Sequence, residues 1–378
     1  MRSWIGSYQA LVASAATQRS VGPPAMLSTL LATLLASSSA ADRFVIAGYA
    51  PDYRLDALDL NQVGANATDI ILFSIQATAE STIDAGAITT MHHMRASRAK
   101  KANPHLRILV SMGGAGRSAM LPKSIETAAG RAKLAKALFK YCKRGKLDGV
   151  DIDWEANEWS PMPNFVDFLK RVRRLFDAEE KPLMLTMAIH TQHADDLAEA
   201  YEHVHRVHLM SYDSPHKDGH AAVRFATQSA QNVLNAGCPA EKLTLGVAFY
   251  GRKMDNTNTA MTFKDLRDMQ QLALAKADGE RFRDDRVAGY SFDSPSTCWL
   301  KVELAAALGL AGVMVWELGQ DAHSTEHRGG VLLAELAAAA AVSSDEWSPG
   351  HKQDIRRVSA AHNAVSMFYM QAGEHDEL

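Results

Sequence analysis

Three carboxylates alternate with apolar residues in the segment from Leu147 to Glu155, which reads Leu-Asp-Gly-Val-Asp-Ile-Asp-Trp-Glu. Valine, isoleucine and tryptophan favour a β-strand, and side chains two residues apart on a strand point to the same face. Asp151, Asp153 and Glu155 would therefore form one row in which the charges repel. At least one of them should have a raised pKa and hold a proton near neutral pH. A general acid catalyst needs such a proton.

Two other interpretations of this row are open. A solvated acidic edge strand would also carry carboxylates, but the interleaved Val150, Ile152 and Trp154 indicate that both faces are covered. Three oxygen ligands could instead hold Mg²⁺ or Ca²⁺, although the segment lacks the glycines and spaced acids of a calcium-binding loop. The pattern favours the catalytic interpretation and predicts neither a metal nor another cofactor.

The same row resembles a known family signature. The run from Asp148 to Glu155 is similar to the DGxDxDxE motif of glycoside hydrolase family 18, the chitinase family. The resemblance implies that Glu155 is the general acid that protonates the glycosidic oxygen. In this family the 2-acetamido group of the substrate assists its own cleavage. Asp153 would orient that group and stabilise the oxazolinium intermediate. Asp151 lies one step deeper, and the three carboxyls would titrate as one unit.

A pair of glycines follows the third expected strand. The segment Ser111-Met112-Gly113-Gly114 is similar to the SxGG motif of the family. Glycine lets the backbone approach a neighbour closely, and Ser111 would hydrogen-bond the deep Asp151. Taken alone, the motif is better explained as an ordinary strand-to-loop turn.

The substrate-binding side chains that the resemblance implies lie near the ends of other expected strands. Tyr212, in a segment similar to the MxYD motif, would donate its hydroxyl to the acetamido group. Trp316 would form the floor of the subsite for that sugar, and Arg252, in a YGR segment, would donate to sugar oxygens. The other binding residues in this pattern are Tyr49, Phe73, Ser111, Gly113, Gly114, Met210, Asp213 and Tyr250.

The elements that must hold these residues alternate along the chain. Apolar β-type segments are separated by helical stretches, of which residues 128–143 show the clearest amphipathic spacing. Eight such repeats predict a (β/α)8 barrel in a single domain, with its active site at the carboxyl ends of the strands. A doubly wound sheet is the alternative, but the turn after the first strand lacks a phosphate-binding glycine loop. The expected strands cover residues 44–49, 70–75, 106–112, 149–154, 183–189, 207–212, 243–250 and 312–316.

The sequence departs from the family pattern at two places. Ala156 and Asn157 follow Glu155, where the family often has Tyr-Pro, and this puts the subsites on the reducing-end side in doubt. The 63 residues from 253 to 315 must also include a helix. They leave little room for the small α+β insertion that deepens the groove in many members. We therefore predict a barrel without that insertion and a shallow, open cleft.

Composition and charge restrict the partners. The chain has 378 residues, of which 47% are hydrophobic and 22% charged, as is ordinary for a globular protein. A net charge of −3 gives no basis for binding nucleic acid or an anionic membrane surface. The cysteines, Cys142, Cys238 and Cys298, are too few for a disulfide scaffold or a zinc cluster. One bridge with one free thiol and three buried thiols both stay open, and the oligomeric state is not predicted.

Both ends of the chain carry patterns typical of targeting. Residues 26–35 are apolar and residues 36–41 are small, which resembles a signal peptide too short to span a bilayer in the mature protein. The first 25 residues are a long n-region, an organelle transit peptide, or lie before a start at Met26. The ending HDEL, residues 375–378, is typical of retention in the endoplasmic reticulum lumen, with secretion as the alternative. We expect an extension over residues 1–41, a catalytic barrel over 42–342 and a tail over 343–378.

Three functions remain open. The first is a retaining, substrate-assisted hydrolase of β-1,4 bonds in chitin or chito-oligosaccharides. The second is an endo-β-N-acetylglucosaminidase that cuts the chitobiose core of N-glycans, and the third is a chitinase-like lectin. Lectins of this kind typically lack the acid, so the presence of Glu155, Asp153 and Tyr212 favours an enzyme.

Overall fold

The computed structural model describes residues 44–155, 162–214, 218–274, 285–323, 327 and 329–346. The chain divides into two units, residues 1–43 and 44–378, and every described residue belongs to the second. The expected signal peptide, the C-terminal HDEL sequence and the Ala156-Asn157 departure lie outside the described residues.

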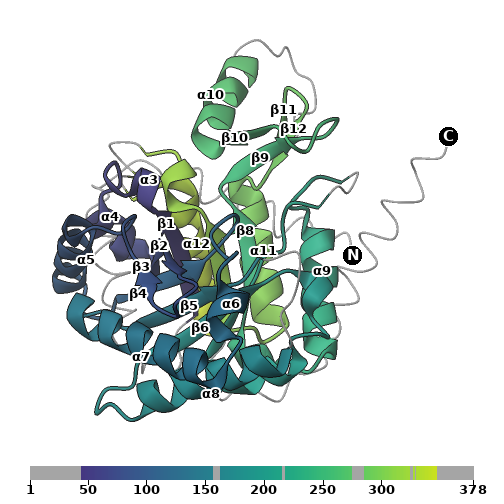
Figure 1. The fold of residues 1–378 in the computed structure, drawn as a ribbon. Helices are drawn as coiled ribbons and strands as arrows, with labels where there is room; N and C mark the ends of the chain where they lie inside the picture. The colour runs from purple at the N-terminus through teal and green to yellow at the C-terminus, as the bar shows by residue number, and fades with distance from the viewer. Residues whose placement is uncertain are drawn as a thin grey trace. The chain divides into compact units, whose positions relative to one another are not determined.

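Parallel strands form a closed barrel (Figure 1). Their order is β1-β13-β8-β7-β6-β5-β4-β2, and pairing of β1 with β2 closes the ring. All eight predicted strands and the predicted (β/α)8 barrel are confirmed, with small shifts at the strand ends. The strands are β1 (Val45–Pro51), β2 (Asp69–Ala77), β4 (Arg107–Gly113), β5 (Gly149–Asp153), β6 (Met184–Ile189), β7 (Arg206–Leu209), β8 (Leu243–Ala248) and β13 (Gly312–Trp316). A short strand, β3 (Ile83–Asp84), pairs antiparallel with β2.

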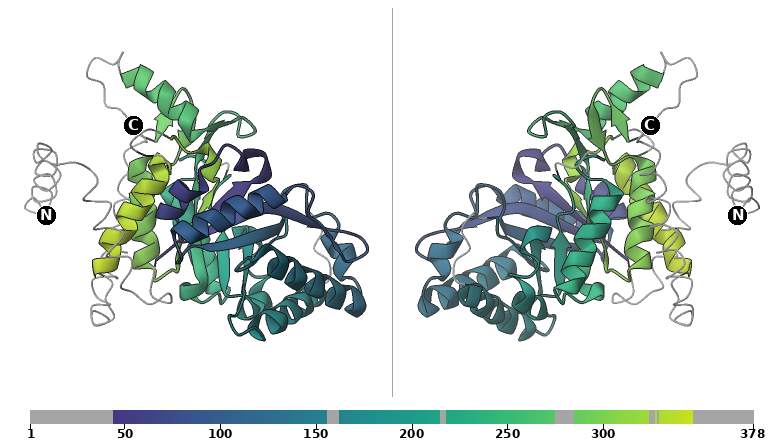
Figure 2. Two further views of the ribbon diagram at one scale, coloured as in Figure 1. Left: turned by 90° about the vertical axis from the view of Figure 1, so that its left-hand side faces the viewer. Right: turned by 90° about the vertical axis from the view of Figure 1, so that its right-hand side faces the viewer.

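Helices surround the barrel, and α11 and α12 lie side by side along it (Figure 2). The amphipathic pattern of residues 128–143 is confirmed, because Leu134, Leu138 and Tyr141 of α7 are buried. No described helix combines the length and the apolar character needed to cross a bilayer. The helices are α3 (Asp52–Leu55), α4 (Leu60–Asn66), α5 (Thr90–Ala102), α6 (Leu121–Ile125), α7 (Ala128–Gly145), α8 (Met162–Asp177), α9 (Val223–Asn235), α10 (Phe263–Leu274), α11 (Pro295–Ala307) and α12 (Val331–Glu346).

Apolar side chains fill two layers. The larger layer includes Val150 and Ile152 of β5 together with buried residues of the surrounding helices. The smaller layer includes side chains such as Ile71 and Met314 that point into the barrel. Since successive strand residues face opposite sides, Asp151 and Asp153 take the interior positions.

The connection between β8 and α11 contains a small α+β unit. Four short antiparallel strands in the order β10-β9-β12-β11 accompany helix α10 (Figure 1). The structure differs here from the expectation of a barrel without an insertion. The 63 residues suffice because the strands are only two to four residues long. The expected shallow cleft rested on that absence and loses its basis. The strands are β9 (Tyr250–Lys253), β10 (Ala260–Thr262), β11 (Arg286–Val287) and β12 (Tyr290–Phe292).

All three cysteines are free and buried, so the structure has three thiols and no bridge between them. Burial raises the pKa of the Cys238 thiol to about 12 and raises that of Cys142 as well. Thiols in such surroundings stay protonated and unreactive.

Candidate active site

Strand β5 directs its acids into the barrel, as the alternation of its sequence predicts. The exposed fractions of Asp151 and Asp153 are 0% and 2%. On the neighbouring β6, Thr186 pairs with Asp151 and Ala188 with Asp153. Glu155 lies just beyond the end of β5 and is partly exposed. The three carboxyl groups therefore form a row that runs from the barrel interior to its mouth.

Three hydroxyl groups donate hydrogen bonds to Asp151. Tyr49 Oη and Ser111 Oγ lie 2.9 and 3.1 Å from Oδ2, and Thr186 Oγ1 lies 2.7 Å from Oδ1. The predicted contact between Ser111 and Asp151 is confirmed. Burial raises the pKa of Asp151 to about 6, although the three hydrogen bonds oppose the shift. Both oxygens are thus engaged, and the carboxyl is held in one orientation beside Asp153.

Asp153 lies in a different environment. Its Oδ1 atom is buried and has no hydrogen-bond partner among the residues that the structure describes. Burial raises the pKa of Asp153 well above its ordinary value, and the charges of Glu155 and Asp151 raise it further. A carboxylate is costly in such surroundings unless a donor or a cation approaches it. Asp153 is therefore suited to accept a hydrogen bond from a ligand that carries positive charge.

Glu155 has polar neighbours on two sides at the mouth of the barrel. Its backbone N–H donates to Ser118 Oγ at 3.1 Å. Its Oε2 atom lies 3.5 Å from Nε2 of His190, which follows β6. The Glu155 side chain is 22% exposed, so its carboxyl can meet a ligand.

The loop after β4 fixes the end of β5. Gly113 and Gly114 have φ angles of +111° and +96°. A Cβ atom on Gly113 would lie 2.1 Å from Asp153 O, and one on Gly114 would lie 2.1 Å from Cζ of Phe73. The Gly114 N–H and Ser118 Oγ both donate to Asp153 O, at 2.7 and 3.0 Å. Backbone angle and space together require glycine at both positions, which is more than an ordinary turn demands.

Aromatic side chains from three strands meet at the mouth. The rings of Phe73 and Trp316 form a T-shaped pair with centroids 4.7 Å apart. The ring of Tyr49 lies 5.6 Å from Trp316 and 6.1 Å from Phe73. Tyr49 and Phe73 are buried, whereas Trp316 is partly exposed. The indole is thus supported by two rings and leaves an apolar surface open to a ligand.

Tyr212 follows β7 and is buried. Its hydroxyl donates to Sδ of Met314 at 3.7 Å, and sulfur is a weak acceptor. Burial raises the pKa of Tyr212, and the neighbouring Tyr250 and Asp153 raise it further. The hydroxyl therefore keeps its proton and can donate to a better acceptor. Met210, two residues earlier, belongs to the same interior apolar layer.

A second charged group joins the barrel to the α+β unit. Asp213 accepts hydrogen bonds from Tyr250 Oη at 2.6 Å and from Nε and Nη2 of Arg252 at 2.5 and 2.7 Å. His220 Nδ1 lies 3.4 Å from the same carboxylate. Burial alone would raise the pKa of Asp213, but the bonds from His220, Arg252 and Tyr250 hold it well below its usual range. Asp213 is therefore a fixed carboxylate next to Tyr212.

Comparison with known families decides to which family these motifs belong. Residues 45–321 match the family described as Glycosyl hydrolases family 18. The chain belongs to family 18. The resemblance of the DGxDxDxE segment is thus confirmed.

The chain matches its curated relatives over only part of their length. Endochitinase 1 of Metarhizium robertsii is 28% identical over 271 residues, which are 59% of this chain and 63% of that protein. Chitinase 63 of Streptomyces plicatus is 26% identical over 304 residues, 66% of this chain and 49% of that protein. The chain therefore spans between about half and two thirds of the curated relatives that it matches.

Solved structures share the fold. The chitinase ChiB from the chitin utilization locus of Flavobacterium johnsoniae has a TM-score of 0.63 at 22% identity and covers 79% of this chain and 94% of its own. The Group IV chitinase of Ostrinia furnacalis, solved with allosamidin, has a TM-score of 0.66 at 20% identity. The match covers 79% of this chain and 99% of that one.

The structure gathers the predicted residues of this family 18 site into two groups. Tyr49 and Ser111 join the row of acids, whereas Tyr250 and Arg252 join Asp213. The Tyr212 ring, 6.2 Å from that of Tyr250, lies between them.

Sequence reasoning missed four polar residues of the site. Thr186 lies on β6 and His190 lies just after it. Both belong to the same series of alternate positions, as the acids do on β5, so strand periodicity would have found them. Ser118 and His220 come from loops and gave no such signal.

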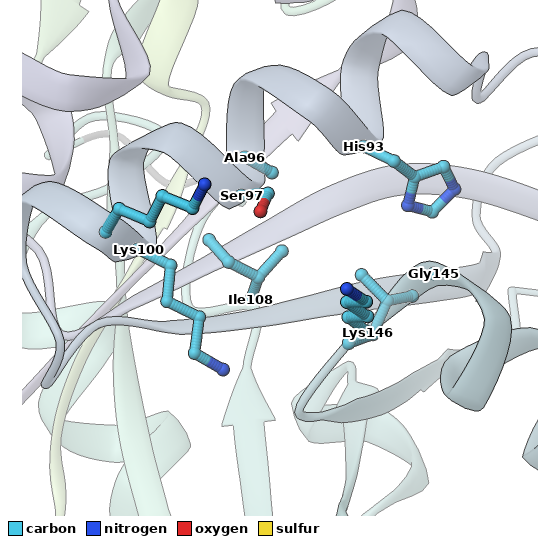
Figure 3. Close-up of a pocket in the computed structure, with 9 residues that line it drawn as sticks. His93, Ala96, Ser97, Lys100, Ile108, Gly145 and Lys146 are labelled. Carbon is cyan, nitrogen blue, oxygen red and sulfur yellow. The ribbon is translucent and has the colours of Figure 1, made fainter.

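A separate hollow lies at the other end of the strands (Figure 3). It has a volume of about 230 Å³, and Ile108 near the start of β4 contributes to its wall. Its lysines, Lys100, Lys101 and Lys146, lie near the C-termini of α5 and α7, where the helix dipole favours positive charge. Lys100 also pairs with Asp148. Its lining contains no Trp, Tyr or Phe, so the hollow offers no flat surface for a sugar ring.

Proposed function

We propose that the chain hydrolyses β-1,4 bonds next to N-acetylglucosamine in chitin or chito-oligosaccharides, with retention of the anomeric configuration. The row of Asp151, Asp153 and Glu155, which rises from the buried interior to the accessible mouth, carries this proposal. The names of the curated relatives, Endochitinase 1 and Chitinase 63, support the same substrate class.

In the first step Glu155 donates its carboxyl proton to the glycosidic oxygen as the C1–O bond breaks. The electrons of that bond stay with the leaving oxygen, so the leaving sugar departs as an alcohol and Glu155 becomes a carboxylate. The carbonyl oxygen of the 2-acetamido group forms a bond to C1 from the opposite face. The product of this step is a positively charged oxazolinium ion.

Asp153 supplies the negative charge that balances this ion. The buried Oδ1 atom without a partner among the described residues accepts the acetamido N–H and stabilises the charge that develops on the ring. Tyr212 donates its hydroxyl to the acetamido oxygen and holds it near C1. In the resting state Asp151 and Asp153 share a proton, so the buried row does not carry every charge at once.

In the second step a water molecule attacks C1, and the carboxylate of Glu155 takes its proton. The bond between C1 and the acetamido oxygen breaks, which restores the acetamide and the Glu155 acid. Two displacements at C1 restore the original configuration. Trp316 supports the apolar face of the sugar, and Asp213 with Arg252 binds hydroxyl groups.

The test is product analysis with the purified full chain and its Glu155→Gln variant. Chito-oligosaccharides and a high-mannose N-glycopeptide are offered in parallel, and NMR follows the anomer that forms first. We expect cleavage of the oligosaccharides to β-anomeric products and loss of turnover with retained binding in Glu155→Gln. The exposed Glu241, just before β8, gives a matched control in Glu241→Gln.

Other outcomes identify other functions. Unchanged turnover in Glu155→Gln would refute the role of Glu155. Cleavage of the glycopeptide alone would identify an endo-β-N-acetylglucosaminidase. Binding of chito-oligosaccharides without cleavage by the wild-type chain would identify a lectin.

A further inference from the structure

Among the described residues, His190 brings a polar side chain close to Glu155 at the mouth of the barrel. Its Nε2 atom lies 3.5 Å from Oε2 of Glu155, and the two side chains are 32% and 22% exposed. We propose that His190 is a positioning residue for Glu155, which it holds through a hydrogen bond that strengthens as the carboxyl proton leaves. This inference rests on the proposed function, because it concerns how Glu155 acts as the acid.

The strand register explains why His190 lies there. Strand β6 runs parallel to β5 and pairs Thr186 with Asp151 and Ala188 with Asp153. Two residues further along, the same alternation brings His190 beside the glutamate at the mouth. Each acid therefore faces a different group: a hydroxyl that donates at 2.7 Å, a methyl, and an imidazole. The methyl leaves Asp153 open to substrate, while the imidazole gives the glutamate a polar partner.

The backbone on both sides of His190 is fixed. The Met210 N–H donates to Ile189 O at 2.9 Å and joins the end of β6 to the segment after β7. The His193 N–H donates to His190 O at 3.1 Å and closes the 3₁₀ turn η1 (Thr191–His193). His190 itself has an extended backbone, with φ −86° and ψ 147°. A side chain held by a rigid strand end suits a positioning role.

The chemistry needs an N–H group at Nε2 of the imidazole. Nε2–H then donates to Oε2 of Glu155, while Oε1 carries the proton that goes to the glycosidic oxygen. As that proton leaves, negative charge spreads over both oxygens, and hydrogen bonds to charged acceptors are shorter and stronger. An interaction that is stronger in the transition state raises kcat and leaves KM almost unchanged. The separation of 3.5 Å is long, and contacts of this kind tighten when substrate binds.

This role makes the effect of His190 depend on the leaving group. A sugar oxygen must receive a proton as it departs, so it depends on the acid. A 2,4-dinitrophenolate is a stable anion and departs with little help. Removing His190 should therefore slow cleavage between sugars and spare cleavage of the aryl glycoside.

The experiment compares the full chain with its His190→Ala, His190→Gln and His193→Ala variants on chitotetraose and on 2,4-dinitrophenyl chitobioside. We expect His190→Ala to lower kcat/KM on chitotetraose about 10- to 100-fold, almost entirely in kcat, which is the loss of one hydrogen bond to a charged group. On the aryl glycoside kcat/KM should change less than about threefold. His190→Gln, which keeps an N–H donor, should recover part of the loss. His193 pairs with Asp196 at 3.6 Å, and His193→Ala should leave both reactions unchanged.

Equal losses on the two substrates, a loss confined to KM, or unchanged kinetics in both His190 variants would overturn the inference. If the wild-type chain cuts chitotetraose, Glu155→Gln does not, and His190→Ala still does at full rate, only this inference fails. A wild-type chain that cuts neither substrate would overturn the proposed function and this inference together.

Discussion

Asp151 and Asp153 are adjacent in one buried row, yet their hydrogen-bond partners differ. Asp151 receives three hydroxyl donors, whereas Oδ1 of Asp153 receives none from the described part of the chain. Burial raises the pKa of both groups. The hydroxyls hold Asp151 in one orientation, as the proton partner in the proposed mechanism requires. The bare oxygen of Asp153 is the one that a substrate cation would approach in that mechanism.

Asp153→Asn should lower kcat on chitotetraose by about 10²- to 10³-fold, because an amide cannot balance the positive charge of the oxazolinium ion. Affinity for chitotetraose should change little, since the ground-state substrate is neutral. Steady-state kinetics and calorimetry measure the two effects, with the exposed Asp196→Asn as the matched control. A loss of less than about tenfold would argue against substrate assistance.

At the scale of elements, the loop after β4 connects three parts of the site. Gly114 contacts both Asp153 O and the ring of Phe73, and that ring supports Trp316. A shift of this loop therefore reaches the acids and the aromatic floor together. Gly116, two residues on, has a φ of +74° but open space around its Cβ position.

Gly114→Ala and Gly116→Ala form a matched pair, because both place a side chain at positive φ. Gly116→Ala should cost only the backbone strain, about 1 kcal/mol of the free energy of unfolding, and leave activity intact. Gly114→Ala should cost about 2–4 kcal/mol and raise KM, since its Cβ would displace Phe73 and with it Trp316. Denaturant unfolding and steady-state kinetics provide the comparison. Equal effects in the two variants would show that the contact with Phe73 does not matter.

The elements also show what could be predicted from the sequence. The barrel strands were found because each is a buried run of β-forming residues, and the acids stood out within one such run. The α+β unit was missed because β11 has two residues and β10 has three, too few for a periodic signal. Its link to the barrel is also non-local: the N–H of Ala248, at the end of β8, donates to Oδ2 of Asp293, which follows β12, at 2.9 Å. Contacts of this kind depend on the completed fold and leave no local pattern.

For the whole molecule, the barrel interior carries charged and polar groups along its length. At the amino ends of the strands, Asp69 pairs with Arg107 at 2.5 Å and with Arg206 at 3.2 Å. His208 lies further along β7 and exchanges a hydrogen bond with Thr244 at 2.7 Å. Burial, together with the charge of Arg206, lowers the pKa of His208 to about 3, although Asp69 opposes the shift. The barrel therefore keeps this imidazole neutral.

This neutral histidine should make the fold sensitive to acid. In the unfolded chain His208 takes up a proton below about pH 6.5, whereas the folded chain excludes that proton until about pH 3. The unfolded state thus binds more protons between these values, and the contribution of His208 to stability falls as pH falls, by about 1.4 kcal/mol for each pH unit. Relative to His208→Gln, the wild-type chain should lose about 2 kcal/mol of unfolding free energy between pH 7.5 and pH 5.

Thr244→Val removes the same hydrogen bond but keeps the imidazole, so its difference from the wild type should stay constant with pH. Denaturant unfolding at several pH values measures these differences. Parallel pH curves for the wild type and His208→Gln would show that His208 takes up its proton alike in the folded and unfolded chains.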